Sequence, residues 1–307
     1  AGEGVPPPLT PPRAQMFRSS LLLAAYASSS FAAPIRKVLV TGANKGIGLH
    51  ICRRILRDHP DCHVLLGSRS LERGEAAVKQ LLKEDPGNNG RVEALELDVT
   101  SDESVRKASE RLRSKEDKLY GIVNNAGIGF GYPLVDTLDT NLFGVKRVCE
   151  SFLPLIDPET GRIVNIASAS GPNFVNGIRD EDEKTAFTSA GTTWTELETI
   201  IKRYTSSGVS ANAYGLSKAC VNLYTRQLAK AHPHLRINSC SPGYILTDLT
   251  AGMGASTPPE KSNCHVAPLF LLFGNPEGNG RYYGSDAVRS PLDVYRGPGD
   301  PPYVADD

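Results

Sequence analysis

A tyrosine and a lysine, Tyr214 and Lys218, stand four residues apart in the segment NAYGLSKAC, residues 212–220. If this segment is helical, the two side chains lie one turn apart on the same face. A phenol ionises at about pH 10, and a neighbouring ammonium favours its ionised form, so such a pair can exchange a proton near neutral pH. The simpler alternative is a solvated helix face that carries both residues by chance.

The segment TGANKGIG, residues 41–48, places Gly42, Gly46 and Gly48 between an apolar run and a helical pattern. Glycines at such a junction let the backbone approach a pyrophosphate, which the N–H groups and dipole of the helix N-terminus then hold. The spacing is G-x-x-x-G-x-G, not the more familiar G-x-G-x-x-G, and a glycine-rich turn can also be only a turn. Its place after the first predicted strand favours a dinucleotide site.

The end of the second predicted strand indicates which dinucleotide is bound. An NAD site has an acid about 20 residues after the glycines, where it holds the ribose 2′-hydroxyl. Here Ser68 stands at that position and Arg69 follows it. A guanidinium suits a 2′-phosphate, and Lys45 in the glycine turn is a second cation. The pattern predicts NADP(H), against the alternative that both cations are simply exposed basic residues.

These residues need a scaffold, and strand-like and helix-like segments alternate along the chain. Apolar runs predict strands at 36–43, 62–69, 91–99, 119–127, 161–168 and 236–243. Helical patterns lie between them at 47–57, 71–84, 101–115, 139–156 and 212–231, with Ser101 as a candidate N-cap. Strands that are apolar on both faces indicate an α/β fold of Rossmann type, in which helices cover both faces of a doubly wound, mostly parallel sheet.

We expect one domain over residues 35–290, followed by a C-terminal tail at 291–307. The domain has a less regular insert at 171–211, which leads into the Tyr–Lys segment. The segment 248–265 is rich in Gly, Pro and Ser, so it predicts a mobile loop. The shape of a substrate pocket is expected to depend on this loop and on the insert.

Composition narrows the classes of partner. Thirty-four basic and 34 acidic residues cancel, and no basic stripe suggests nucleic acid. No metal site and no membrane span are expected. The cysteines lack a C-x-x-C pair and are expected to be reduced core residues of an intracellular protein. They are Cys52, Cys62, Cys149, Cys220, Cys240 and Cys264.

Residues 1–34 differ in composition from the rest. A Pro-rich stretch is followed, after Met16, by one Arg, the apolar run LLLAAYA and several small residues. The run is too short to span a bilayer. The order of charge, apolar run and small residues fits a cleavable leader, and a disordered extension is the alternative. Localisation therefore stays open between the cytoplasm and an organelle.

Seven motifs occur in an order that resembles the short-chain dehydrogenase/reductase family. They are TGANKGIG, LDV (97–99), NNAG (124–127), Asn141 in TNLFG, Ser168 in NIAS, Tyr214-x-x-x-Lys218 and PGYILT (242–247). The most similar subgroup is the NADPH-dependent carbonyl reductases, which also have an insert before the tyrosine. The resemblance runs from about residue 36 to 285.

The resemblance implies four catalytic residues. Tyr214 would be the general acid that protonates a carbonyl oxygen as hydride arrives, and Lys218 would lower its pKa and hold the nicotinamide ribose. Ser168 would hydrogen-bond the substrate oxygen, and Asn141 would hold a water that links Lys218 to solvent. In the simpler alternatives, Asn141 is a polar residue at a helix start and Ser168 one hydroxyl of the run ASAS.

The resemblance also implies the cofactor contacts. Asp98 and Val99 would lie near the adenine, although Asp98 can also cap the next helix. Asn125 would lie near the adenosine ribose, and Ile245 to Thr247 on the nicotinamide side. The implied cofactor-binding residues are Gly42, Asn44, Lys45, Gly46, Ile47, Gly48, Ser68, Arg69, Asp98, Val99, Asn125, Ala126, Gly127, Tyr214, Lys218, Pro242, Gly243, Ile245 and Thr247.

Two features depart from most relatives: the interval from Asn125 to Asn141 is short, and the insert is long. The insert segment 193–204 carries an apolar stripe at helical spacing. Its members are Trp194, Leu197, Ile200, Ile201 and Tyr204. We expect the stripe to pack on the protein's own body and to cover the surface that relatives use to associate, which predicts a monomer. A protein–protein interface is the alternative.

The leading hypothesis is NADPH-dependent reduction of a small carbonyl compound: an aldehyde, a ketone or a quinone. One alternative is a biosynthetic reductase of one specific ketone. The other is a catalytically silent protein that binds NADP(H) and acts as a partner. The intact set of Asn, Ser, Tyr and Lys argues against this last alternative.

Overall fold

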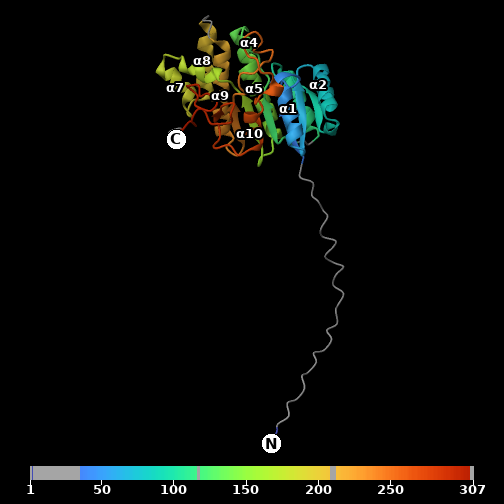
Figure 1. Ribbon diagram of the computed structural model, residues 1–307. Coiled ribbons are helices and arrows are strands. Elements are labelled where there is room, and N and C mark those ends of the chain that lie inside the picture. The colour runs from blue at the N-terminus through green and yellow to red at the C-terminus, as the bar shows by residue number, and fades with distance from the viewer. Residues whose placement is uncertain (1, 3–34, 116–117, 208–211, 305–307) are drawn as a thin grey trace. The chain divides into compact units, whose positions relative to one another are not determined.

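Figure 1 shows the chain as a computed structural model, which describes residues 2, 35–115, 118–207 and 212–304. The proposed leader or extension, apart from residue 2, lies outside the described residues, as do the last three residues of the tail.

Within the described residues, seven parallel strands form one sheet in the order β3-β2-β1-β4-β5-β6-β7. The strands are β1 Arg36–Val40, β2 Cys62–Ser68, β3 Val92–Glu96, β4 Gly121–Asn124, β5 Arg162–Ile166, β6 Arg236–Cys240 and β7 Tyr282–Tyr283. The order reverses between β1 and β4, which opens a crevice at the carboxyl ends of the strands. The predicted doubly wound sheet is confirmed, and the short β7 is an addition to it.

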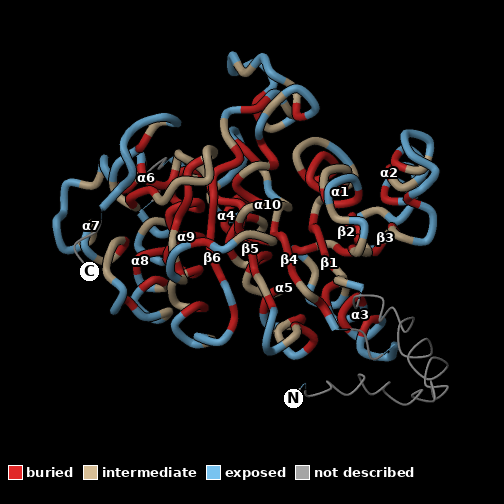
Figure 2. Tube along the Cα trace, turned by 60° about the horizontal axis from the view of Figure 1, so that its bottom comes forward, coloured by how far each residue is buried: buried red, intermediate tan, exposed pale blue. Residues whose placement is uncertain are grey.

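Helices cover both faces of the sheet. The main ones are α1 Gly46–Asp58, α2 Leu71–Glu84, α3 Asp102–Arg113, α5 Gly144–Phe152, α9 Ala213–Ala231 and α10 Val266–Phe273. Buried side chains of α1, α2 and α10 pack on one face, and those of α3, α5 and α9 pack on the other. Figure 2 shows the row of strands from β6 to β3, with α1, α2 and α10 on one side and α3 and α5 on the opposite side.

The central strands are apolar throughout because each face of the sheet has its own core. In β1, Val38 and Val40 join the cluster with α1, whereas Leu39 points to the cluster with α5 and α9. This alternation follows from the two-residue period of a strand.

The helix that carries Asn141 begins earlier than the sequence pattern predicts. It starts with α4 Leu134–Leu138, passes through a π-helical turn at Asp139–Phe143 and continues as α5 and a 3₁₀ turn at Leu153–Leu155. The expected boundary at residue 139 is therefore wrong. Pro133 sits at the N-cap, and the buried Leu138, Leu142 and Val145 continue the apolar stripe from there. The π turn holds one residue more than an α-helical turn would.

The insert forms three helices, α6 Ser170–Asn176, α7 Glu181–Thr188 and α8 Trp194–Ser206. A capping box between Thr193 and Glu196 starts α8. As expected, the apolar stripe of α8 packs on the protein's own body. Leu197, Ile200 and Ile201 are buried in the large core, and the Trp194 ring lies edge-on to Tyr224 of α9, with 5.8 Å between ring centroids.

All six cysteines are buried and none forms a disulfide. Among the described residues, no helix is both long and apolar enough to cross a bilayer. The same part of the chain contains no group of three His, Cys, Asp or Glu side chains placed to hold a metal ion.

Candidate active site

The glycine turn packs directly on the loop after β4. Gly42 and Gly46 have φ of 60°, a left-handed conformation that favours glycine. A methyl group added at Gly42 would lie 2.7 Å from Cα of Ala126, and one at Gly48 would lie 2.5 Å from Nδ2 of Asn125. The turn therefore needs glycine at these positions for close packing, and not only for chain reversal.

The N-terminus of α1 is open to an anion. Lys45 is its N-cap residue, and no side chain caps the helix. The first N–H groups of the helix thus lack the side-chain acceptor that usually satisfies them, and a phosphate can supply it. Asn44 and Ile47, from the same turn, are half-buried.

Asn125 and Thr41 tie the two loops together. The Asn125 side-chain amide donates to the carbonyl oxygens of Thr41 at 3.0 Å and Gly42 at 3.1 Å. The Thr41 hydroxyl accepts from the backbone N–H groups of Asn125 and Ala126, both at 3.0 Å. In this structure the amide of Asn125 thus holds the glycine turn, and its contact with a ribose stays a prediction.

At the end of β2, Ser68 and Arg69 point to different surroundings. Ser68 is buried, and its hydroxyl donates to the carbonyl oxygen of Ser70 at 2.9 Å. Arg69 is exposed and makes no ion pair within the described part of the chain. Arg73, which the sequence analysis missed, is also exposed, in the first turn of α2. In the sequence, only its place at the start of the helix after the second strand could have indicated Arg73 as a candidate contact for the cofactor.

The residues expected near the adenine follow β3. Asp98 is half-buried and accepts hydrogen bonds from the backbone and the hydroxyl of Thr100. Val99 packs against Gly144, where an added methyl group would lie 2.9 Å from Cγ2 of the valine. Ser101 caps α3, as the sequence indicated, so Asp98 is not the cap.

Tyr214 and Lys218 lie one turn apart at the start of α9. The side chain of Asn212 accepts from the N–H of Gly215 and so begins the helix just before the tyrosine. Both functional side chains are nearly enclosed, with 8% and 5% of their surface exposed. The Lys218 ammonium lies 5.6 Å from the centre of the Tyr214 ring and donates to the carbonyl oxygen of Ile166, at the end of β5, at 2.8 Å.

Ser168 follows β5, and its side chain has a hydrogen bond with the phenol of Tyr214. Burial raises the pKa of Tyr214, and a hydrogen bond with the Ser168 side chain opposes this shift. The Ser168 hydroxyl also accepts from the backbone N–H of Ser170 at 3.2 Å, so it is held at the start of α6. The structure thus brings Tyr214, Lys218 and Ser168 to one place.

Asn141 is fully buried in the π turn and holds two segments. Its side chain exchanges two hydrogen bonds with the backbone of Ile128, at 2.9 and 3.0 Å, and donates to the Ser217 hydroxyl at 3.0 Å. Gly127 stands next to it, since an added methyl group there would lie 3.1 Å from Oδ1 of Asn141 and 3.7 Å from the Lys218 ammonium. The predicted water, which Asn141 would hold and which would link Lys218 to solvent, stays a prediction.

Burial also acts on Lys218, whose pKa it lowers to about 8. An ammonium surrounded by protein loses hydration, so its neutral form is favoured. The lysine therefore changes charge within the range in which an enzyme can be assayed.

The segment after β6 forms the other wall of the crevice. Pro242 and Ile245 are buried, and Gly243 has φ of 93°. Thr247 approaches the glycine turn, because a methyl group added at Gly46 would lie 3.6 Å from its Cγ2. The next residue, Asp248, forms an ion pair with Lys45 that the sequence analysis did not foresee.

Phe130 is a second residue that sequence reasoning missed. Its ring centroid lies 4.6 Å from that of Tyr214, although the side chain is 42% exposed. The neighbouring Gly129 touches Leu249 of the segment after β6. An aromatic side chain thus covers the phenol at the mouth of the site, and only the fold places it there.

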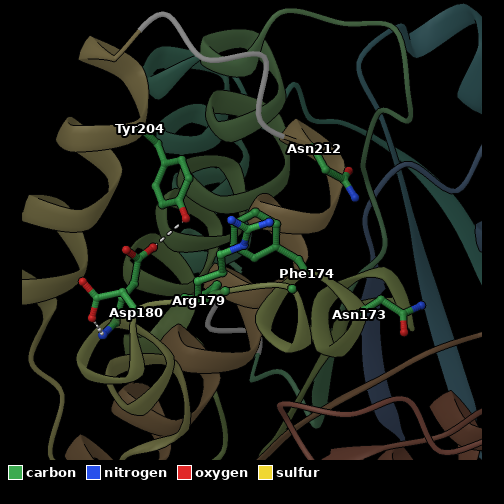
Figure 3. Close-up of a pocket in the computed structure, with 9 residues that line it drawn as sticks. Asn173, Phe174, Arg179, Asp180, Tyr204 and Asn212 are labelled. Carbon is green, nitrogen blue, oxygen red and sulfur yellow. Dashed lines mark hydrogen bonds between the residues drawn. The ribbon is translucent and has the colours of Figure 1, made fainter.

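The insert adds a pocket of about 510 Å³ beside the start of α9 (Figure 3). Phe174 of α6, Tyr204 of α8 and Asn212 contribute to its lining. The Tyr204 hydroxyl donates to Glu183 at 2.6 Å, which fixes one wall. The four predicted catalytic residues are not among its lining, so this pocket is separate from the phenol itself.

Comparisons with known proteins agree with this arrangement. A family model described as short chain dehydrogenase matches residues 36–178. Mouse carbonyl reductase [NADPH] 3 is 34% identical over 265 residues, which cover 79% of this chain and 92% of that protein. (+)-Neomenthol dehydrogenase of Arabidopsis thaliana is 33% identical over 273 residues, with 77% and 92% covered. The solved menthone neomenthol reductase of Mentha piperita superposes with a TM-score of 0.68 at 27% identity, over 83% of this chain and 99% of that one.

Proposed function

Since this chain belongs to the short-chain dehydrogenase family, we propose that it reduces the carbonyl group of an aldehyde, ketone or quinone with hydride from NADPH. The chain is an NADP-dependent oxidoreductase, and NADP(H) is its cofactor. The identity of the substrate and the roles of the individual side chains belong to the proposal.

The residues of the crevice fit the cofactor. The uncapped N-terminus of α1 suits the pyrophosphate, and the exposed Arg69 suits a 2′-phosphate at the end of β2. Lys218 would hold the nicotinamide ribose, as the family resemblance implies. When bound, NADPH supplies the hydride.

In the proposed reaction, Tyr214 gives its proton to the carbonyl oxygen while the carbonyl carbon receives hydride. The pKa of Tyr214 is raised by burial, so the phenol is protonated and ready to donate. The phenolate left behind is stabilised by the Lys218 ammonium, and Ser168 donates a hydrogen bond to the substrate oxygen. A positioned acid of this kind typically contributes about 10²–10⁴-fold to the rate.

The observation that carries the proposal is the position of Tyr214. Its phenol has a hydrogen bond with Ser168, and the Lys218 ammonium lies 5.6 Å from its ring. Lys218 also lies next to Gly127, in the loop that packs on the glycine turn. A protein that only binds NADP(H) has no need for this arrangement.

A second candidate is a biosynthetic reductase of one specific ketone. It is favoured by the similarity to (+)-neomenthol dehydrogenase and by the insert, which lines a pocket of its own. The two candidates differ in breadth of substrate and not in chemistry.

The test is NADPH consumption, followed by its absorbance, with a panel of quinones, aldehydes and cyclic ketones. We expect turnover with several members. With the aldehydes and ketones, NADPH deuterated at its transferable position should leave one deuterium on the carbinol carbon. Turnover of a single ketone would favour the biosynthetic reductase. Tight NADPH binding without turnover of any member would contradict the proposed function.

A further inference from the structure

Two segments that flank the proposed cofactor crevice are joined by one ion pair. The Lys45 ammonium, in the glycine turn, contacts the Asp248 carboxylate, in the segment after β6. The side chains are 64% and 78% exposed, so both remain accessible to a ligand from solvent. Within the described residues, neither has another charged partner.

The cations predicted to read the 2′-phosphate are therefore not equivalent. Arg69 is exposed and makes no ion pair in residues 35–115, 118–207 and 212–304. Lys45 already has the Asp248 carboxylate as its ion-pair partner. A phosphate that recruits Lys45 has to compete with Asp248, and it brings its own negative charge close to that carboxylate.

We propose that Asp248 is a specificity-determining residue that weakens the preference for 2′-phosphorylated cofactors by holding Lys45. This inference rests on the proposed function, since it concerns the same NADP(H) site. Arg69 then remains as the principal reader of the phosphate, and Lys45 contributes only part of its charge.

The proposal predicts an effect that depends on the 2′-phosphate. An ion pair that merely closed the loop over the cofactor would influence NADPH and NADH alike. An acid that competes for Lys45 changes only the affinity of ligands that carry the 2′-phosphate. Because exposed ion pairs are weak, we expect a change of about two- to fivefold.

The experiment is a calorimetric titration of wild type and Asp248→Asn with adenosine 2′,5′-bisphosphate and with adenosine 5′-monophosphate. Neither probe has a nicotinamide half, so contacts of the loop with that half do not contribute. We expect Asp248→Asn to bind the bisphosphate about two- to fivefold more tightly, with the monophosphate unchanged. The ratio of NADPH to NADH affinity should rise by the same factor.

Two further variants make the test specific. In a Lys45→Met background, Asp248→Asn should have no effect on either probe, because the competition has been removed. Asp136, an exposed acid of α4 without an ion pair among the described residues, provides the charge-matched control. Asp136→Asn should leave the ratio of the two affinities unchanged.

Equal changes for both probes, no change in the bisphosphate affinity, or an effect that persists without Lys45 would overturn the role of Asp248. These outcomes are distinct from failure of the proposed function. If wild type binds neither NADPH nor the bisphosphate, the assignment of the cofactor site itself is wrong.

Discussion

At the scale of single residues, burial shifts the pKa values of Tyr214 and Lys218 of α9 in opposite directions. It raises the pKa of Tyr214 and lowers the pKa of Lys218 to about 8. Both shifts favour the neutral form, because a charged group loses hydration inside the protein. The phenol therefore stays a proton donor, whereas the lysine titrates in the accessible pH range.

The pH dependence of carbonyl reduction follows from these shifts. Below about pH 8 Lys218 is charged and stabilises the phenolate that forms in the reaction, and above this value the charge is lost. We predict that kcat/KM for reduction is level on the acid side and falls as pH rises through about 8. Lys218→Arg, which keeps its charge, should lack this fall in its residual activity. A wild-type rate that rises through the same pH would contradict the assignment.

At the scale of elements, the junction of the glycine turn with the loop after β4 leaves no room at Gly48. An added methyl group would lie 2.5 Å from Nδ2 of Asn125 and 2.7 Å from the carbonyl oxygen of Gly42. We predict that Gly48→Ala lowers the free energy of unfolding by about 1–3 kcal/mol and weakens NADPH binding, as measured by denaturant titration and calorimetry.

The matched control is Gly177→Ala at the end of α6. Gly177 has φ of −80°, and an added methyl group there would be 3.4 Å from the nearest atom, an ordinary contact. This variant should keep wild-type stability to within about 0.5 kcal/mol. Equal stability of both variants would mean that the turn relaxes and that the close packing at Gly48 carries no energy.

Local pattern was enough to predict most elements and the crevice between them. Strands β1 to β6 and the helices that follow β1, β2, β3 and the insert lie where the apolar periodicity placed them. The start of α4 was missed because the predicted helix began at residue 139, whereas α4 begins just after Pro133. Contacts such as Lys45 with Asp248, or Phe130 with Tyr214, join segments far apart in the chain. No local pattern encodes them.

At the scale of the whole molecule, the insert bears on whether the surface near α9 is available to a second copy of the chain. Leu197 and Ile201 of α8 are buried, and Trp194 and Tyr204 pack partly against the same core. An apolar stripe that packs within its own chain is not available to bind a second copy. We propose that the chain is a monomer near 33.0 kDa, with the insert covering the surface that relatives use to associate.

Light scattering behind a sizing column tests this proposal. We expect one species with the mass of a single chain at micromolar concentration. A stable dimer or tetramer would mean that the insert forms an interface instead of covering one.

The most direct test of the central claim compares NADPH binding with turnover in Tyr214→Phe. This change keeps the ring that packs against Phe130 and removes only the hydroxyl. We predict that the Kd for NADPH stays within a few fold of wild type, while kcat for carbonyl reduction falls at least about a hundredfold. Turnover like that of wild type would remove Tyr214 from the mechanism and contradict the proposed reaction.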